Sequence, residues 1–333
     1  MQFSDSEILH IIETDDREEI ESLYAQARKT REEHYGKGVY FRGLIEFTNY
    51  CKNDCYYCGI RCSNKNIERY RLSPDDILDC CRAGDKLGFK TFVLQGGEDP
   101  FFTTERVTQI VSAIRQEFPE HAITLSIGER PRSDYESFFR AGANRYLLRH
   151  ETASGEHYVK LHPPSMSLAE RKQCLWDLKK IGYQTGAGFM VGTPHQTPDC
   201  LLADIRFLEE LQPQMAGIGP FIPHKDTPFC DYPPGSLQLC LKMLALTRIL
   251  LPKALMPATT AIGTIAPNGR ELALNSGANV VMPNLTPTAM RKLYALYDDK
   301  ICIGDDAVKC RFCIEGRIVS AGYVSEMIRG DAR

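Results

Sequence analysis

Strand-like and helix-like segments alternate along this chain of 333 residues, and this alternation limits the possible folds more than any other feature. Short apolar runs that end in glycine, proline or a polar cluster are typical of buried parallel strands. The eight predicted strands are residues 44–47, 91–95, 122–127, 145–148, 185–191, 215–218, 255–262 and 279–282. Predicted helices lie between them at 74–87, 104–118, 133–141, 168–181, 198–211, 237–250 and 270–276.

Regular β–α alternation favours a parallel sheet with right-handed crossovers, and eight such units predict an α/β fold that is a complete (β/α)8 TIM barrel. An open barrel of six units with an appended region is the alternative. We expect an N-terminal helical cover at residues 1–38, the barrel at 39–298 and a Cys-rich C-terminal tail at 299–333. The tail is predicted to be helical over 317–329. In either barrel the functional site should lie at the C-terminal ends of the strands.

Three cysteines follow the first predicted strand directly. Cys51, Cys55 and Cys58 have C-x3-C-x2-C spacing, and three thiolates leave one iron of a four-iron cluster without a protein ligand. Cys62 could complete a zinc site, and an ordinary electron-transfer cluster is a further alternative. With the aromatic Tyr57 before the last cysteine, the motif resembles the signature of the radical S-adenosylmethionine (SAM) superfamily.

Other chemically useful residues follow later strands. Gly96 and Gly97 end the second strand in Gln95-Gly96-Gly97-Glu98, where glycines let the backbone approach a ligand. A plain β–α turn would use glycines in the same way. Glu151 after the fourth strand suits ribose hydroxyls, and Arg171 suits a carboxylate through bidentate hydrogen bonds. The alternative for both charged residues is a surface ion pair.

The remaining cysteines and the overall charge bear on the compartment and the partners. Cys302, Cys310 and Cys313 form a C-x7-C-x2-C motif that predicts a second iron–sulfur cluster, with zinc or unbound thiols as alternatives. Clustered thiols in a chain with 13 cysteines favour the reducing cytoplasm. The net charge of -3 and the absence of a long basic or apolar run predict neither nucleic-acid binding nor a membrane span.

Seven longer runs resemble one family, the FeFe-hydrogenase maturation enzyme HydE. They are RGLIEFTN, LQGGEDP, RYLLRHETA, GAGFMVG, GIGPFIPH, PATTAIGT and GANVVMPN. The resemblance implies that Cys51, Cys55 and Cys58 hold a 4Fe-4S cluster whose open iron binds SAM. It implies that Glu151 binds the SAM ribose, that Arg171 binds its carboxylate and that Gly96 and Gly97 lie near its amino group. Residues expected to border SAM or the cavity below it are Tyr57, Thr124, Arg145, Met215, Thr259, Thr260, Met282, Tyr294 and Tyr297.

The implied function is reductive cleavage of SAM to a 5′-deoxyadenosyl radical during assembly of the diiron unit of the FeFe-hydrogenase active site. The implied partners are an organometallic iron–cysteine substrate, a reductant such as ferredoxin or flavodoxin, and the other hydrogenase maturases. Another enzyme of the biotin synthase and methylornithine synthase group is the alternative. The three predicted strands at 122–127, 145–148 and 185–191 lack the cysteines that biotin synthase needs, and methylornithine synthase lacks the C-terminal cysteine motif. A non-catalytic iron–sulfur carrier would bind iron but not SAM.

Overall fold

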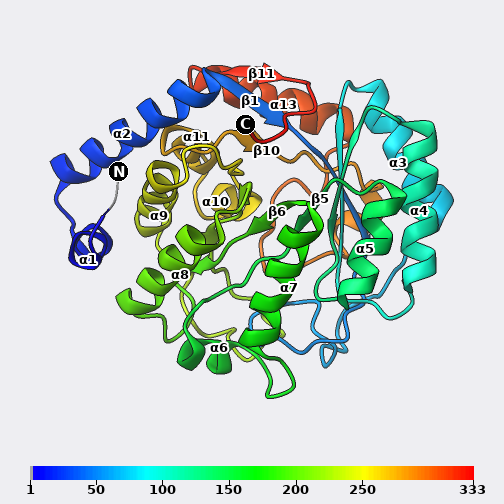
Figure 1. The fold of residues 1–333 in the computed structure, drawn as a ribbon, viewed down its shortest axis with the longest axis horizontal. Helices are drawn as coiled ribbons and strands as arrows, with labels where there is room; N and C mark the ends of the chain where they lie inside the picture. Colours follow the sequence, from blue (N-terminus) through cyan, green and yellow to red (C-terminus); the bar gives the residue numbers. More distant parts are fainter. Residues whose placement is uncertain (1–2) are drawn as a thin grey trace.

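The computed structural model describes residues 3–333, and it contains a six-stranded parallel sheet with helices around it (Figure 1). The strands pair in the order β2-β3-β4-β5-β6-β8. Their bounds are β2 Gly43–Thr48, β3 Thr91–Gly96, β4 Ala122–Ser126, β5 Arg145–Leu147, β6 Gln184–Ala187 and β8 Met215–Ala216. Because all of these pairs are parallel, the carboxyl ends of the six strands meet at one edge of the sheet.

The surrounding helices begin and end close to the predicted positions, except α6, which the sequence did not predict. They are α3 Pro74–Lys86, α4 Thr104–Glu117, α5 Arg132–Ala141, α6 Gly155–Leu161, α7 Leu168–Ile181, α8 Pro198–Leu211 and α9 Leu237–Leu250. The Ser73 hydroxyl accepts a hydrogen bond from Asp76 N–H, and Ser167 caps α7 in the same way. Gly142 and Gly182 end α5 and α7 with φ angles of 114° and 107°, which favour glycine.

The predicted strand at 185–191 is in fact two strands. β6 ends at Ala187, and β7 (Met190–Val191) pairs instead with β9 (Gly219–Pro220). Gly188 separates them at φ 154°, and a Cβ there would lie 2.0 Å from the carbonyl oxygen of Gly217. The chain can cross this close backbone contact only with glycine, and the strand breaks where the contact occurs.

The predicted strand at 255–262 is wrong in its second half. Helix α10 (Thr260–Ile265) begins there, because the Thr259 hydroxyl accepts a hydrogen bond from Ile262 N–H and caps it. The first half makes only single parallel bridges, from Leu255 to Met215 and from Pro257 to Val280. After α11 (Gly269–Asn275) the chain forms β10 (Val280–Val281), and a further bridge joins Asn284 to Leu44 of β2.

Segments from the N-terminal and C-terminal parts of the chain pack against each other on one side of this assembly. Helices α1 (Asp5–Glu13) and α2 (Arg17–Tyr35) lie in the N-terminal segment that was predicted to be helical, and α2 packs on α9 through Leu23, Ala27, Ala245 and Ile249. Strand β1 (Gly38–Phe41), which the sequence did not predict, lies between β10 and β11 (Val324–Glu326). The predicted tail helix at 317–329 is correct only over 317–320. After α12 (Thr288–Arg291), helix α13 spans Ala307–Ser320 and begins earlier than predicted, because Asp306 caps it, and a strand follows.

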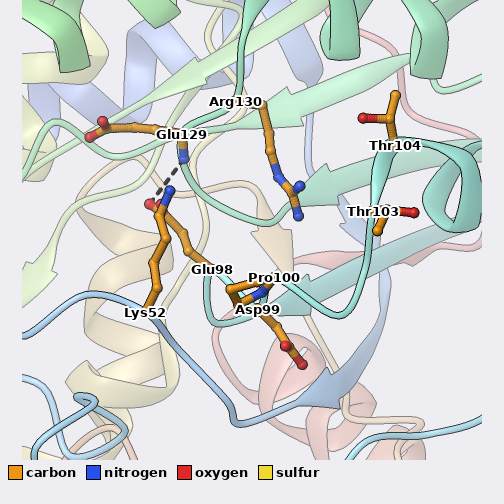
Figure 2. A pocket seen from close by; sticks show the side chains of 8 residues that line it. All are labelled: Lys52, Glu98, Asp99, Pro100, Thr103, Thr104, Glu129 and Arg130. Atoms are coloured by element: carbon orange, nitrogen blue, oxygen red, sulfur yellow. Dashed lines mark hydrogen bonds and ion pairs between the residues drawn. The ribbon is translucent and has the colours of Figure 1, made fainter.

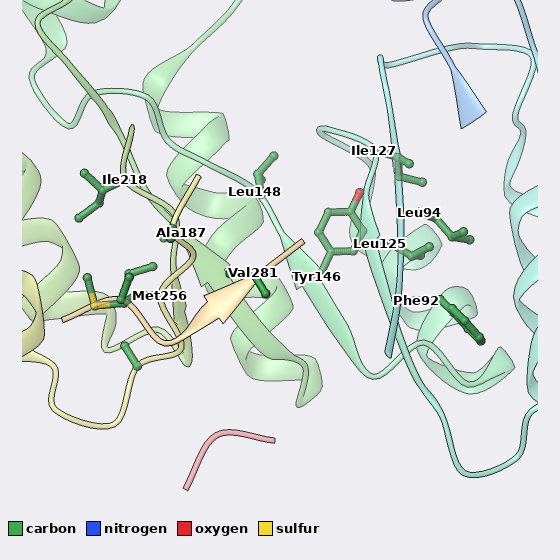
Figure 3. Close-up of a cluster of buried hydrophobic side chains, with 14 of the residues drawn as sticks. Phe92, Leu94, Leu125, Ile127, Tyr146, Leu148, Ala187, Ile218, Met256 and Val281 are labelled. Carbon is green, nitrogen blue, oxygen red and sulfur yellow. The ribbon is translucent and has the colours of Figure 1, made fainter. Parts of the chain in front are cut away.

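Alternation along the strands separates two environments. Phe92, Leu125 and Tyr146 belong to the main hydrophobic cluster between the sheet and its helices (Figure 3). Their neighbours Thr124 and Arg145 are paired in the register of β4 and β5 and point to the opposite face of the sheet. On these strands polar side chains are therefore buried on one face of the sheet, whereas the main apolar cluster lies on the face that the helices cover.

Candidate active site

The three cysteines of the loop after β2 line one cavity of about 230 Å³ at the carboxyl ends of the strands. Other predicted site residues line the same cavity: Tyr57, Gly96, Gly97, Glu151, Arg171 and Tyr294. Cys62 is not among the residues that line it. The fold thus brings together side chains separated by as many as 243 positions, from Cys51 to Tyr294.

The two glycines at the end of β3 are required by the packing of the cysteine loop. A Cβ on Gly97 would lie 2.2 Å from the Tyr50 carbonyl oxygen and 2.8 Å from Cys51 Cβ. A Cβ on Gly96 would lie 2.8 Å from Thr48 Cγ2. The next residue in this turn continues the contact, because the Glu98 carbonyl accepts a hydrogen bond of 2.9 Å from Lys52 N–H. The turn after β3 therefore holds the backbone at the first cysteine.

Gly97→Ala should lower both the iron content and the stability of the protein, since the new methyl group must push the Tyr50–Cys51 backbone away. Overpacking of this kind costs about 1–3 kcal/mol. Urea unfolding and iron analysis after anaerobic reconstitution would measure the two effects. Gly155→Ala is the matched control, because a Cβ at Gly155 meets no heavy atom within 4 Å. Equal behaviour of the two variants would contradict this role of Gly97.

The three thiols require a positive charge to become ligands. Burial raises the pKa of Cys58 to about 12 and holds the pKa of Cys55 well above its usual value, and the neighbouring thiols add to both shifts. A bound iron cluster would supply the charge that keeps such thiols deprotonated. Among residues 3–333, no three His, Cys, Asp or Glu side chains are grouped as ligands of a single metal ion.

Glu151 is held in a strained conformation, and one of its carboxylate oxygens is ion-paired but accepts no hydrogen bond within residues 3–333. Its φ of 67° lies in the left-handed region, which glutamate rarely adopts. Its Oε2 lies 2.9 Å from Arg149 Nη2, yet this buried oxygen accepts no hydrogen bond from any described residue. A carboxylate oxygen with free acceptor capacity, facing a cavity, fits a ligand that offers hydroxyl groups.

A buried pair, His150 and Asp204, fixes the backbone around Glu151. His150 Nδ1 accepts a hydrogen bond of 3.3 Å from Gly188 N–H, so its Nε2 carries the proton and donates to Asp204 Oδ1 at 3.2 Å. Asp204 also accepts a hydrogen bond from Ala153 N–H. Burial lowers the pKa of His150 and raises that of Asp204. His150 is thus a structural histidine that ties α8 to residues 150–153.

Arg171 is positioned by two acids that were not predicted as site residues. Its Nε donates to the Arg149 carbonyl at 2.9 Å, and its Nη1 lies 2.8 Å from Glu129 Oε1 and 3.6 Å from Glu98 Oε1. Burial alone would lower the pKa of Arg171, but Glu129 and Glu98 raise it well above its usual value. Glu129 follows the strand-ending Gly128, so a search of every strand end could have found it.

Tyr57 is oriented by a histidine that was also missed. His162 Nδ1–H donates to the Tyr158 carbonyl at 3.0 Å, so Nε2 accepts the hydrogen bond of 3.1 Å from the Tyr57 hydroxyl. The Tyr57 side chain then lines both the main cavity and an adjoining one of about 130 Å³. His162 lies 105 positions from Tyr57, and no local motif marks the contact.

His162 should make the protein sensitive to acid. Burial, and next the Arg171 charge, lower the pKa of His162 to about 3, whereas an unfolded histidine has a pKa near 6.5. The unfolded chain therefore binds the extra proton first, and stability falls as the pH drops below about 6.5. Between pH 7 and pH 5, unfolding of the iron-free protein in urea should lose about 2 kcal/mol more in the natural chain than in His162→Gln. Equal losses would contradict this.

The other predicted cavity residues divide into two groups. Thr259 and Tyr297 line the adjoining cavity. Neither cavity is lined by Thr124, Arg145, Met215, Thr260 or Met282. Arg145 is fully buried and bonds to the chain end, with its Nη2 2.8 Å from Asp331 Oδ1 and 2.9 Å from the Arg329 carbonyl. The Met215 sulfur accepts a hydrogen bond of 3.0 Å from Arg42 Nη1.

The structure brings two of the three tail cysteines together. A hydrogen bond from Cys310 and the charge of Arg270 lower the pKa of Cys302, and Arg270 Nη1 lies 3.6 Å from its sulfur. Cys310 is buried on α13, whereas Cys313 on the same helix is exposed. The second cluster therefore stays a prediction.

Comparison with known proteins decides the family. Residues 45–208 match the family model described as the radical SAM superfamily. The chain is 47% identical, over 94% of its length and 89% of the relative, to the [FeFe] hydrogenase maturase subunit HydE of Thermotoga maritima. The chain belongs to the HydE family of radical SAM enzymes. The 3-methylornithine synthase of Methanosarcina acetivorans is more distant, at 31% identity over 89% of this chain and 84% of that protein.

Solved structures agree with this HydE-family fold. The crystal structure of methylornithine synthase (PylB) superimposes with a TM-score of 0.87 at 28% identity, covering 98% of this chain and 95% of that one. The structure of HydG, a maturase of the [FeFe]-hydrogenase, has a TM-score of 0.82 at 19% identity and covers 98% of this chain and 73% of that one, which shows a shared fold. Every helix within residues 3–333 is too short or too polar to cross a lipid bilayer.

Proposed function

We propose that this HydE-family enzyme cleaves SAM reductively and acts in assembly of the diiron unit of the [FeFe] hydrogenase active site. The observation that carries the proposal is the single cavity that Cys51, Cys55 and Cys58 share with Glu151 and Arg171. Three thiols, one carboxylate with unused acceptor capacity and one guanidinium are the groups needed to hold a cluster with an open iron and a zwitterionic nucleoside ligand.

Each residue then has a separate task. Cys51, Cys55 and Cys58 would hold a 4Fe-4S cluster, which, with SAM bound, supplies the electron that generates a 5′-deoxyadenosyl radical. The Glu151 carboxylate would accept hydrogen bonds from the ribose, and the Arg171 guanidinium would bind the SAM carboxylate. Gly96 and Gly97 leave backbone room near the amino group. Residues proposed to border SAM or the substrate cavity are Tyr57, Thr124, Arg145, Met215, Thr259, Thr260, Met282, Tyr294 and Tyr297.

The closed barrel and its additions belong to the same proposal. Single bridges at Leu255, Pro257 and Asn284 support closure of the ring between β8 and β2 into a complete (β/α)8 barrel. Residues 1–38 would be its helical cover, 39–298 the barrel, and 299–333 the tail with a possible second cluster at Cys302, Cys310 and Cys313. The free state of all 13 cysteines is in keeping with the reducing cytoplasm.

The proposed substrate is an organometallic iron–cysteine species supplied by another maturase, and the electron donor is a ferredoxin or flavodoxin. The name of the 47% identical relative supports the hydrogenase role. The polar interior residues, such as Thr124, whose buried hydroxyl has no hydrogen-bond partner among the described residues, suit a polar substrate below SAM.

Anaerobic reconstitution with iron and sulfide, followed by dithionite and SAM, tests the chemistry. The protein should form 5′-deoxyadenosine, measured by chromatography, whereas Cys51→Ser should give only background. No product above that background would refute the radical SAM proposal. A test for formation of 3-methylornithine would separate the hydrogenase role from the methylornithine synthase alternative.

A further inference from the structure

An exposed aromatic side chain stacked between arginines lies beside the cysteine loop. Phe101, in the turn between β3 and α4, is 43% exposed. The Arg106 guanidinium lies 3.9 Å from the centre of its ring, and that of Arg71 lies 4.7 Å from it. Arg71 also lies 3.7 Å from the centre of the Tyr50 ring. We call Tyr50, Lys52, Arg71, Phe101 and Arg106 the Phe101 patch.

The Phe101 patch is joined directly to the first cluster ligand. Tyr50 and Lys52 are the neighbours of Cys51 in the chain. The hydrogen bond from Lys52 N–H to the Glu98 carbonyl ties this segment to the turn that carries Phe101. Gly97, in the same turn, also packs closely against the backbone of Tyr50 and against Cys51. A molecule bound to the patch would therefore lie over the backbone that presents the Cys51 sulfur.

The charge that the Phe101 patch presents to solvent is positive, although the chain as a whole is acidic. The side chains of Lys52 and Arg71 are 55% and 33% exposed, whereas those of their partners Glu98 and Asp99 are only 8% and 1% exposed. Arg106 is exposed, and its Nη1 donates to a backbone carbonyl, that of Phe101. The buried carboxylates of Glu98 and Asp99 thus hold Lys52 and Arg71 in place, and the cationic groups are exposed to solvent.

A hollow continues the patch on one side. A cavity of about 310 Å³ lies there, and its lining is of mixed charge (Figure 2): Lys52 and Arg130 with Pro100, Thr103, Thr104 and the acids Glu98, Asp99 and Glu129. In Figure 2 the Lys52 side chain ends beside the Glu98 carboxylate, and the Arg130 side chain enters from the opposite side of the hollow. The Phe101 patch itself, with its exposed cations and aromatic ring, is the surface that suits an acidic partner, since aromatic residues and arginine are the types enriched at the centres of protein interfaces.

We propose that the Phe101 patch docks the protein that reduces the cluster, a small one-electron carrier with an acidic surface around its redox centre. This rests on the proposed function, which requires such an electron. In the step, the carrier is oxidised by one electron and the cluster is reduced by one electron, and no covalent bond forms or breaks. Opposite charges would steer the encounter and set its orientation, so the rate should fall with ionic strength.

Charge reversal at Arg106 tests this proposal in the reconstituted enzyme. Arg106 lies in the first turn of α4, where an acidic residue is favourable to the helix, so Arg106→Glu should fold and bind iron normally. With a reduced flavodoxin as donor at low salt, SAM cleavage should be roughly tenfold slower than in the natural enzyme. With saturating dithionite the two rates should be equal. Phe101→Ser should show the same selective loss without a change of charge.

Arg140→Glu is the matched control. Arg140 is also an exposed arginine, but it lies at the C-terminal end of α5, away from the cysteine loop. Its flavodoxin-driven rate should stay unchanged. The proposal is overturned if Arg106→Glu and Phe101→Ser keep the full flavodoxin-driven rate, if they lose activity equally with dithionite, or if Arg140→Glu is slowed as much. Failure of the proposed function itself looks different, since the natural enzyme would then form no 5′-deoxyadenosine with dithionite.

Discussion

Cys55→Ser is expected to abolish the iron–sulfur cluster, whereas Cys62→Ser is expected to leave the iron content of the reconstituted protein unchanged. Cys55 lines the cavity with Cys51 and Cys58, and Cys62 does not. A serine hydroxyl is a poor replacement for a thiolate, so the loss of one of only three ligands should release the cluster. Iron and sulfide analysis, together with the visible absorption of the cluster, measures both variants.

The same pair of variants separates the two kinds of metal site. In a four-cysteine zinc site, both substitutions would lower metal binding, because each removes one of four ligands. Equal losses in Cys55→Ser and Cys62→Ser would therefore contradict the open-iron site. Cys230→Ser is a further control for handling of the protein, since Cys230 is an exposed free thiol outside the cavity.

Arg171→Met should weaken SAM binding strongly while leaving the cluster in place. The substitution removes the guanidinium that lines the cavity and leaves the Glu129 and Glu98 carboxylates without their cation. Loss of one partner of a buried charge pair costs about 2–5 kcal/mol, which corresponds to a rise in the KM for SAM of roughly 30-fold or more. Titration of SAM against the cluster spectrum and steady-state assays would both report it.

Glu129→Gln distinguishes positioning from direct binding. The amide can still accept the hydrogen bond from Arg171 Nη1 but carries no charge, so the guanidinium should become more available to the SAM carboxylate. The KM for SAM should then change by less than about tenfold, a limit that corresponds to 1.4 kcal/mol. A loss as large as that of Arg171→Met would mean that Glu129 itself binds the ligand, and an unchanged KM in Arg171→Met would refute the carboxylate role.

The order of elements could be predicted from the sequence because it depends on local patterns. Apolar runs of four to seven residues between capped helices predicted the six strands of the sheet. The residues after the strands supplied Cys51, Gly97 and Glu151, and the helix α7 supplied Arg171. The failures occurred where tertiary contacts override local preference. The close contact of Gly188 with Gly217 splits one predicted strand, and the cap at Thr259 turns half of another into a helix.

The sequence by itself determined the family, the three-cysteine motif and the set of chemically active strand ends, since spacing and residue type carry that information locally. Only the tertiary structure decided which charges face the cavity and which hold others in place. Glu98 and Glu129 fix Arg171, His162 orients Tyr57, and the chain end at Asp331 reaches Arg145 across 186 positions. These pairs form because the fold brings distant parts of the chain together, and a sequence pattern does not show which distant residues lie close in space.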